Sequence, residues 1–86
     1  MTNRAALPLL ANAVDALAAA ERELKRARAE ATRRLALAVV DTMRTKEWSM
    51  RDFAKAHNVS APHVCDITHE RRYSGRVARR LLKTTP

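Results

Sequence analysis

Two helix start signals of the same kind lie within residues 48–72, WSMRDFAKAHNVSAPHVCDITHERR, and they restrict the fold more than any other feature. In the first signal, Ser49 is a residue type that caps helix N-termini, and Asp52 three residues later completes a capping box. Trp48 precedes the cap and Phe53 follows it by four residues, which is the spacing of a hydrophobic staple. A short helix is therefore predicted to begin directly after the cap.

The second start signal repeats this pattern at Ser60. Val59 before the cap and Val64 four residues after it form a second staple. Pro62 lies in the first turn, where a helix loses nothing by the missing N–H of proline. Between the two signals stands Asn58, and Asn is the commonest non-glycine residue in the left-handed conformation that ends a helix and redirects the chain.

These signals predict two short helices, residues 50–57 and 61–71, joined by a tight turn. A small residue, Ala54, stands where the two helices cross, and helices that cross steeply need such a residue to pack closely. With 3.6 residues per turn, Val64 and Ile67 face the core while the rest of the second helix faces outward. We therefore expect a helix-turn-helix.

A long N-terminal segment, roughly residues 9–30, has a seven-residue apolar repeat that forms a narrow seam of leucine and alanine. The seam belongs either to a solvated helix packed on its own domain or to a dimer. We favour the dimer, because about three heptads exceed what a small core needs. Both parallel and antiparallel pairing fit the sequence. Leu10, Leu17, Leu24 and Ala31 occupy one heptad position and Ala13, Ala20 and Ala27 another, and the three leucines are the candidate dimerisation residues.

Residues 32–46 show a wider apolar stripe, which suits a helix packed inside a core. No glycine or proline separates this segment from the preceding one, so residues 9–46 form one long helix or two helices that meet near residues 31–33. A last helix follows the capping residue Ser74. The stripe consists of Leu35, Ala38, Val39, Thr42 and Met43, with Ala36 and Val40 alongside; the last helix has Val77, Ala78, Leu81 and Leu82 on an apolar face and Arg76, Arg79, Arg80 and Lys83 on a basic one.

The composition agrees with an all-α fold. The 86 residues include 1 Gly and 3 Pro, 47% are apolar and 3% are aromatic, which leaves little for turns and sheets. We predict that residues 1–31 form a coiled-coil or dimerisation segment and residues 32–86 a helix-turn-helix domain, with about four helices in all. One core of this size is marginally stable, so oligomerisation is the expected support.

The formal net charge of +8 favours a polyanionic partner such as double-stranded DNA. Residues 1–49 hold 9 Lys/Arg against 6 Asp/Glu, a net of +3, and residues 50–86 hold 8 against 3, a net of +5. Most of the excess follows Glu70. The residues concerned are Arg71, Arg72, Arg76, Arg79, Arg80 and Lys83.

A single cysteine, Cys65, cannot form an internal disulfide and fits a reducing cytoplasm. The apolar residues 5–20 resemble a signal peptide, but Asn12 and Asp15 interrupt them, and we favour a cytoplasmic protein. No stretch is long and apolar enough to span a bilayer. We therefore expect no membrane partner, and no small-molecule ligand is evident.

Phe53, Ala54, Asn58, Val64 and Ile67 have the spacing of the helix-turn-helix in the lambda-repressor-like family of phage and bacterial transcriptional regulators, which this chain resembles. That family places an apolar residue and a small Ala in the first motif helix, Gly or Asn at the turn, and two apolar anchors in the recognition helix. The resemblance implies a DNA-binding dimer whose half-sites lie about one helical turn, roughly 34 Å, apart.

The resemblance covers about residues 35–83 and assigns the second motif helix to the major groove. The chain departs from the family at Ala61 and Pro62, where family members carry Gln, Asn, Arg or Lys. These two side chains contact only thymine methyls, whereas Asp66 can accept from a cytosine amine, so most of the affinity is expected from arginines on phosphates. The expected base contacts are Ser60, Ala61, Pro62, His63, Cys65, Asp66 and His69, and the expected phosphate contacts are Ser49, Arg51, Arg71, Arg72, Arg76, Arg79 and Arg80.

Other chemistry has less support in the sequence. Cys65, His69 and the nearby His63 offer two or three metal ligands, but a closed zinc site needs four, and the next candidate, His57, is on the other helix. Cys65 as an oxidant sensor, activated by the histidines, is the alternative to a small groove-facing cysteine. The sequence shows no nucleophile, base and acid arrangement and no glycine-rich phosphate loop, so we expect neither an enzyme nor a cofactor.

The expected function is therefore that of a small cytoplasmic, sequence-specific transcriptional regulator of phage or mobile-element origin. It would act as a homodimeric repressor that occupies a two-fold operator through helix 60–71. The alternative is a helical protein-interaction or phage assembly module, similar to a small terminase subunit, in which the seam does the main work and the helix-turn-helix is a scaffold.

Overall fold

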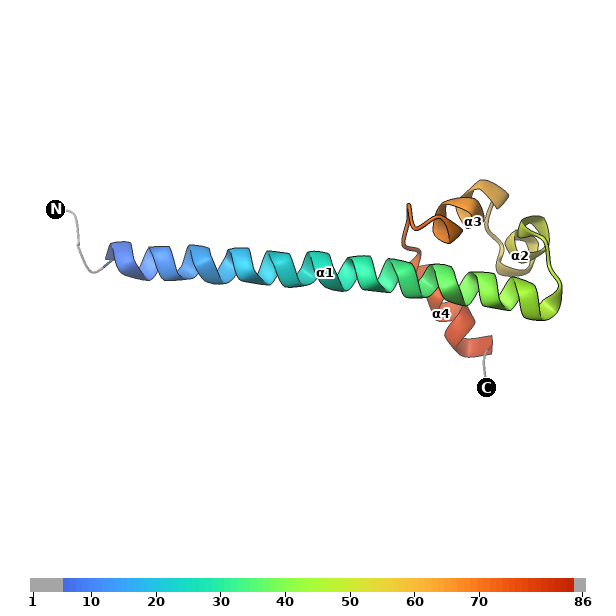
Figure 1. Ribbon diagram of the computed structural model, residues 1–86, viewed down its shortest axis with the longest axis horizontal. Helices are drawn as coiled ribbons and strands as arrows, with labels where there is room; N and C mark the ends of the chain where they lie inside the picture. The colour runs from blue at the N-terminus through green and yellow to red at the C-terminus, as the bar shows by residue number, and fades with distance from the viewer. Residues whose placement is uncertain (1–5, 85–86) are drawn as a thin grey trace.

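The computed structural model describes residues 6–84, which contain four helices and no strand (Figure 1). The helices are α1 (Ala6–Lys46), α2 (Met50–His57), α3 (Ala61–Thr68) and α4 (Gly75–Thr84). The prediction of an all-α fold with a long N-terminal helix is confirmed. Among these four helices, none has an apolar stretch of the length that crossing a membrane requires.

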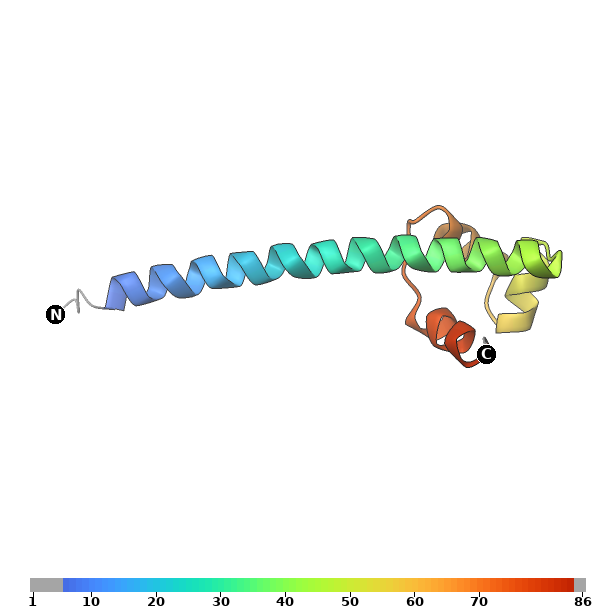
Figure 2. The same ribbon diagram turned by 60° about the horizontal axis from the view of Figure 1, so that its bottom comes forward.

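α1 is one continuous helix of 41 residues, so the predicted segment 9–46 forms one helix and not two. Its first part, residues 6–30, is called the arm here. The arm extends away from the other helices and gives the molecule a length of 68 Å (Figures 1 and 2). The second part, residues 31–46, forms the domain together with α2, α3 and α4. The boundary predicted after residue 31 thus falls inside α1, at the base of the arm.

The core of the domain lies where α2, α3 and α4 pack against one stripe of α1. This stripe is centred on Leu35 and Val39, as predicted, and on Ala36, which was predicted alongside it. Met43 packs against the same core. Ala38 is exposed, contrary to the prediction, because it lies on the opposite side of Leu35 from Ala36 around the helix. The other helices contribute the buried side chains of Phe53, Ala54, Val64, Ile67, Val77 and Leu81.

α2 begins and ends where the sequence predicts. The Ser49 hydroxyl accepts the Asp52 N–H at 3.2 Å, and the Asp52 carboxylate accepts the Ser49 N–H at 2.9 Å, so the capping box is complete. The rings of Trp48 and Phe53 meet edge to face with centroids 6.4 Å apart, as expected of the staple. At the other end Asn58 is left-handed, with φ 54° and ψ 48°.

α3 is shorter than predicted. The predicted helix covered residues 61–71, whereas α3 ends at Thr68. Glu70 is left-handed, with φ 58°, and the Glu70 and Arg71 N–H groups donate to two carbonyls of the last turn at 3.1 and 2.9 Å. These are the two hydrogen bonds of a Schellman ending, in which a left-handed residue stops the helix. Glutamate is seldom left-handed, so the residue types did not signal this end.

α4 begins after Ser74, whose hydroxyl accepts the Val77 N–H at 3.3 Å, so the predicted cap is present. Val77 and Leu81 are buried, and Ala78 packs against the core. Leu82 was predicted on the same apolar face but is 78% exposed. The contact face of α4 is narrower than predicted, because it is centred on Val77 and Leu81 and the next residue points about 100° away.

α1 ends in the same way as α3, at Glu47 with φ 57°, and this predicts that Glu47→Gly stabilises the protein. A residue with a Cβ is strained in this conformation and glycine is not, although glycine also makes the unfolded chain more flexible. The expected net gain is about 0.5–1 kcal/mol. Glu47→Ala keeps the Cβ and serves as the control. Urea unfolding of both variants measures the effect, and equal stabilities would contradict the explanation.

Candidate nucleic-acid interface

α3 packs on α1 and α2 through one face and exposes the other. Val64 and Ile67 are 0% exposed, so the predicted inner face of the helix is confirmed. Ser60 caps the N-terminus of α3 by accepting the His63 N–H at 3.2 Å. Of the candidate base contacts, Ser60, Pro62 and His69 are exposed, whereas Ala61, His63, Cys65 and Asp66 are half-buried.

A shallow groove of about 500 Å³ lies beside the N-terminus of α3. Ser60 and His63 line it from the start of α3, Arg72 from the segment before α4, and Arg76 from α4 itself. Two candidate phosphate contacts, Arg72 and Arg76, therefore lie in the same groove as two candidate base contacts, Ser60 and His63. Guanidinium groups and the N–H groups of a helix N-terminus both attract phosphate, so the groove is suited to a nucleic-acid backbone. Asn58, Val59, Tyr73, Ser74 and Gly75 complete its lining.

Tyr73 is a groove residue that the sequence analysis did not single out. Its side chain is 51% exposed. It lies between the groove arginine Arg72 and the capping residue Ser74, and a Cβ built on Gly75 would lie 3.8 Å from its ring. The signal in the sequence was the position of the one tyrosine of the chain between an arginine and a helix cap.

The Asp66 carboxylate and the Arg71 guanidinium form an ion pair at 3.2 Å. These two residues were predicted separately, as a base acceptor and a phosphate donor. Arg71 Nη2 also lies 3.7 Å from Cys65 Sγ, so the guanidinium covers part of the outer face of α3. The Arg71 and Asp66 side chains are 59% and 42% exposed, and a pair this exposed contributes only about 0–1 kcal/mol. Either side chain can therefore leave this ion pair for another charged group at little cost in free energy.

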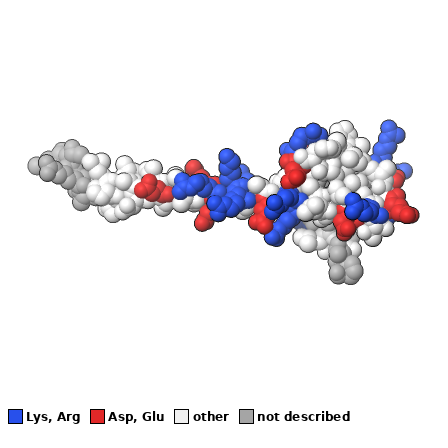
Figure 3. Space-filling view, in the orientation of Figure 1, with Lys and Arg blue, Asp and Glu red and all other residues white. Residues whose placement is uncertain are grey.

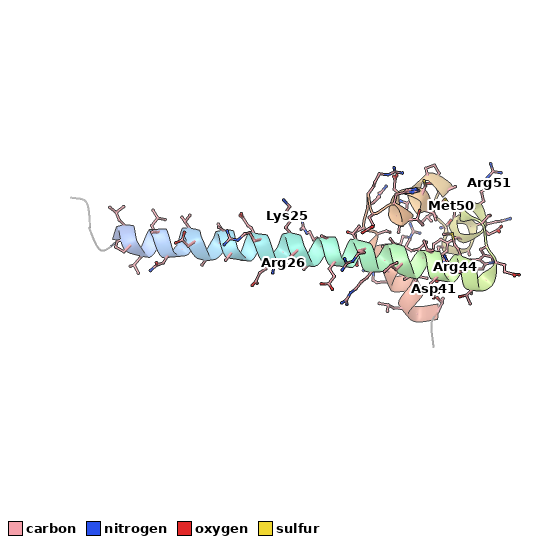
Figure 4. The ribbon with its side chains drawn as sticks, in the orientation of Figure 1. Lys25, Arg26, Asp41, Arg44, Met50 and Arg51 are labelled. Atoms are coloured by element: carbon pink, nitrogen blue, oxygen red, sulfur yellow. The ribbon has the colours of Figure 1, made fainter. Side chains whose placement is uncertain are left out.

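The other candidate phosphate contacts lie outside this groove. Arg80 Nη2 reaches the carbonyl of Ala56 at 3.4 Å and lines a separate cavity of about 370 Å³ between α1, α2 and α4. Arg79 Nε donates to a carbonyl of its own helix at 3.2 Å. Ser49 caps α2, and Arg51 projects outward from the same helix (Figure 4). The lysines and arginines visible in Figure 3 accordingly occur at several places on the domain and do not form one patch.

The arm carries both charged residues and the candidate dimerisation leucines. Lys25 and Arg26 project in different directions from the arm (Figure 4), because successive residues of a helix point about 100° apart, so these two charges do not share a face. Leu10, Leu17 and Leu24 are 59%, 61% and 52% exposed. Since they recur every seven residues on one helix, the three leucines lie on the same side of the arm.

His57 is buried in the domain, with 5% of its surface exposed. Its ring stacks on Phe53 with centroids 4.2 Å apart and planes 18° apart. Within residues 6–84 its Nδ1 has no hydrogen-bond partner. Burial, followed by the nearby cations of Arg80 and Lys46, lowers the pKa of His57 below its usual value of 6.5. The folded domain therefore favours the neutral imidazole.

Cys65 and His69 lie together on α3, with Sγ and Nδ1 3.6 Å apart. His69 Nδ1 is also 2.8 Å from the carbonyl oxygen of Cys65. Within the described part of the chain, no group of three or more His, Cys, Asp or Glu side chains is placed to hold a metal ion. His63 is therefore not brought to Cys65 and His69 as a third metal ligand, and its Nε2 is a buried atom without a hydrogen-bond partner in residues 6–84.

Comparisons of this chain with protein-family models, with curated proteins and with solved structures each gave no match.

The lowered pKa of His57 predicts a stability that falls as the pH is lowered. Above its unfolded pKa of about 6.5 the histidine is neutral in both states; below it the unfolded chain takes up a proton that the folded domain resists. Between the folded-state and unfolded-state pKa values of His57, the free energy of unfolding falls by an amount that approaches about 1.4 kcal/mol for each pH unit. Thermal unfolding at pH 7.5 and 5.5 measures it. His57→Leu should flatten the dependence, whereas the exposed-site control His69→Gln should not. An unchanged slope in His57→Leu would contradict the assignment.

Proposed function

We propose that the protein is a sequence-specific DNA-binding transcriptional regulator that places α3 in the major groove. The observation that carries the proposal is the groove beside the capped N-terminus of α3, where Arg72 and Arg76 meet Ser60 and His63. A DNA phosphate in this groove would receive two guanidinium groups and would hold the start of α3 against the base edges. The net charge of +8 supplies the long-range attraction to DNA.

On this proposal, the outer face of α3 contacts the DNA bases. Ala61 and Pro62 offer apolar contacts for thymine methyl groups, and His63 and His69 offer hydrogen bonds. Asp66 accepts from a cytosine amine once Arg71 leaves the ion pair for a phosphate, and the exposure of that pair makes the exchange inexpensive. We propose that the protein acts as a homodimeric repressor on a two-fold operator, because occupying a promoter requires no part beyond those described.

The proposal predicts that Arg72→Ala and Arg76→Ala weaken DNA binding at every sequence to a similar extent. Each change removes about one phosphate contact, so the slope of log K against log salt should become shallower by roughly one for each variant. Arg44→Ala, an exposed site on α1 that does not line the groove, is the matched control. Gel shifts across salt concentrations, with an operator selected from random DNA, measure the slopes. Sequence-independent binding by the unaltered protein would reject the proposal.

The exposed leucines of the arm favour a second candidate function, a helical protein-interaction or phage assembly module in which DNA contact is secondary. The two candidates differ in what dimerisation does. For a regulator, the arm serves to bring two domains to one operator. For an assembly module, the arm is the functional surface itself.

Leu17→Glu separates the two candidates, because it places a charge on the leucine face of the arm and leaves the domain intact. The regulator proposal predicts loss of dimerisation in sedimentation and about a tenfold or greater loss of operator affinity, with an unchanged helical signal from the domain. Leu37→Glu is the control, since Leu37 is 64% exposed and lies on the opposite side of α1. Loss of dimerisation without any loss of operator affinity would favour the assembly module.

A further inference from the structure

The arm has one apolar face, which consists of Leu7, Leu10, Val14, Leu17 and Leu24. These side chains are between 52% and 61% exposed. They follow one another by three, four or seven residues, so they lie in one stripe along the helix. Asp15 is the sole charged residue in the sequence from 6 to 20. Because Asp15 is one residue from Val14, it points away from the stripe.

The stripe of the arm continues into the face of α1 on which the domain is built. Leu17 precedes the buried Leu35 by 18 residues (35 minus 17), which is five complete helical turns. Leu7 precedes Met43, which packs against the core, by 36 residues (43 minus 7), which is ten complete turns. The core of the domain therefore lies on the same side of α1 as the exposed stripe. Figures 1 and 2 show the domain further along α1 than the arm.

We propose that a second copy of this chain covers the stripe, and that the two arms run antiparallel. A parallel partner is ruled out by the position of the domain. In a parallel pair each domain would lie between the two helices, and both domains would need the same space. In an antiparallel pair each domain lies beyond the N-terminal end of the other arm, so the two stripes meet along their length.

The charges of the chain favour the same orientation. Glu21 and Arg28 interrupt the stripe, and in a parallel, in-register pair each would face its own copy, so that like charges meet. Antiparallel pairing removes both contacts. It also places the two C-terminal parts of the chain, residues 50–86 with 8 Lys/Arg against 3 Asp/Glu, at opposite ends of the dimer. Parallel pairing would hold these two net charges of +5 side by side.

The edge of the domain fixes the register of the pair. A cavity lined by Ala27, Arg28, Ala31, Thr32 and Tyr73 marks where the domain first stands beside α1. The stripe of a second copy, counted from its Leu7, can therefore lie along the arm as far as Leu24, the last stripe residue before this cavity. In this register Leu7 lies beside Leu24 of the second copy, and Val14 beside its Leu17. The paired segment is about 20 residues, or roughly 30 Å, long.

This register sets the distance between the two domains. The midpoint of the paired segment lies near residue 15, and Val39, the centre of the core on α1, is about 24 residues further along. At 1.5 Å per residue the two cores are roughly 70 Å apart, which corresponds to two turns of DNA and not to one. This consequence rests on the proposed function, and it predicts half-sites centred about 20–21 base pairs apart.

Disulfide crosslinking tests the orientation without DNA. The full chain with Cys65→Ser as background carries Leu7→Cys, Leu24→Cys, or both. The double variant should form a covalent dimer in high yield, because the two sites meet across the antiparallel pair within disulfide reach. Each single variant should crosslink poorly. An intramolecular bond is impossible, since 17 residues of helix hold the two sites about 25 Å apart. Leu37→Cys, on the opposite side of α1, is the control.

Efficient self-crosslinking of Leu24→Cys alone would show a parallel pair and overturn the proposal. A chain that sediments as a monomer at all concentrations would also overturn it. Operators with half-sites one and two turns apart then test the spacing by gel shift. Failure of all DNA binding in a crosslinked dimer would reject the proposed function while the antiparallel pair stands, so the two failures are distinguishable.

Discussion

Burial of the Leu35 and Val39 side of α1 is the interaction on which the rest of the structure depends. Phe53 from α2, Val64 and Ile67 from α3 and Val77 from α4 bury their side chains in one cluster with this side of α1, so all three short helices gather at one end of α1. A helix of eight residues is not stable alone and takes its position from such packing. The buried core therefore fixes the positions of the outward face of α3 and of Arg72, although these residues lie outside the core.

Three left-handed residues redirect the chain around this core, and they show which parts of the fold residue types can predict. Asn58 ends α2 where expected, because Asn tolerates the conformation and two caps bracket it. Glu47 and Glu70 adopt the same conformation without such a preference. The end of α1 at Lys46 agrees with the predicted segment, whereas the predicted end of α3 at residue 71 was wrong. Because no Gly or Pro separates residues 9–30 from residues 32–46, the sequence allowed one long helix as well as two, and α1 is one helix.

The candidate interface was predictable to the extent that it depends on helical periodicity. The spacing of Val64 and Ile67 identified the buried side of α3 and thereby the side available to a partner. The pairing of Asp66 with Arg71 was not foreseen, because it spans the end of α3 that the sequence did not reveal. The reach of Arg80 to Ala56 joins residues 24 positions apart in the sequence, and no periodic pattern predicts such a contact. The groove likewise depends on the path from Glu70 to Ser74.

The stripe of the arm and the core of the domain share one side of α1. On the proposals of a dimer and of DNA binding, this shared side links the way in which two chains associate to the way in which two domains meet DNA. If the stripe and the domain lay on opposite faces, the arms could pair in parallel and hold the two copies of α3 close together. Because Leu17 and Leu35 are in phase, whatever covers the stripe must stop at the edge of the domain. On the antiparallel proposal, the length of the arm then sets the distance between the two domains. Inserting one heptad between Leu24 and Ala31 keeps the stripe in phase within about 20°. With the second copy again reaching the edge of the domain, the insertion moves the domains further apart by roughly 10 Å.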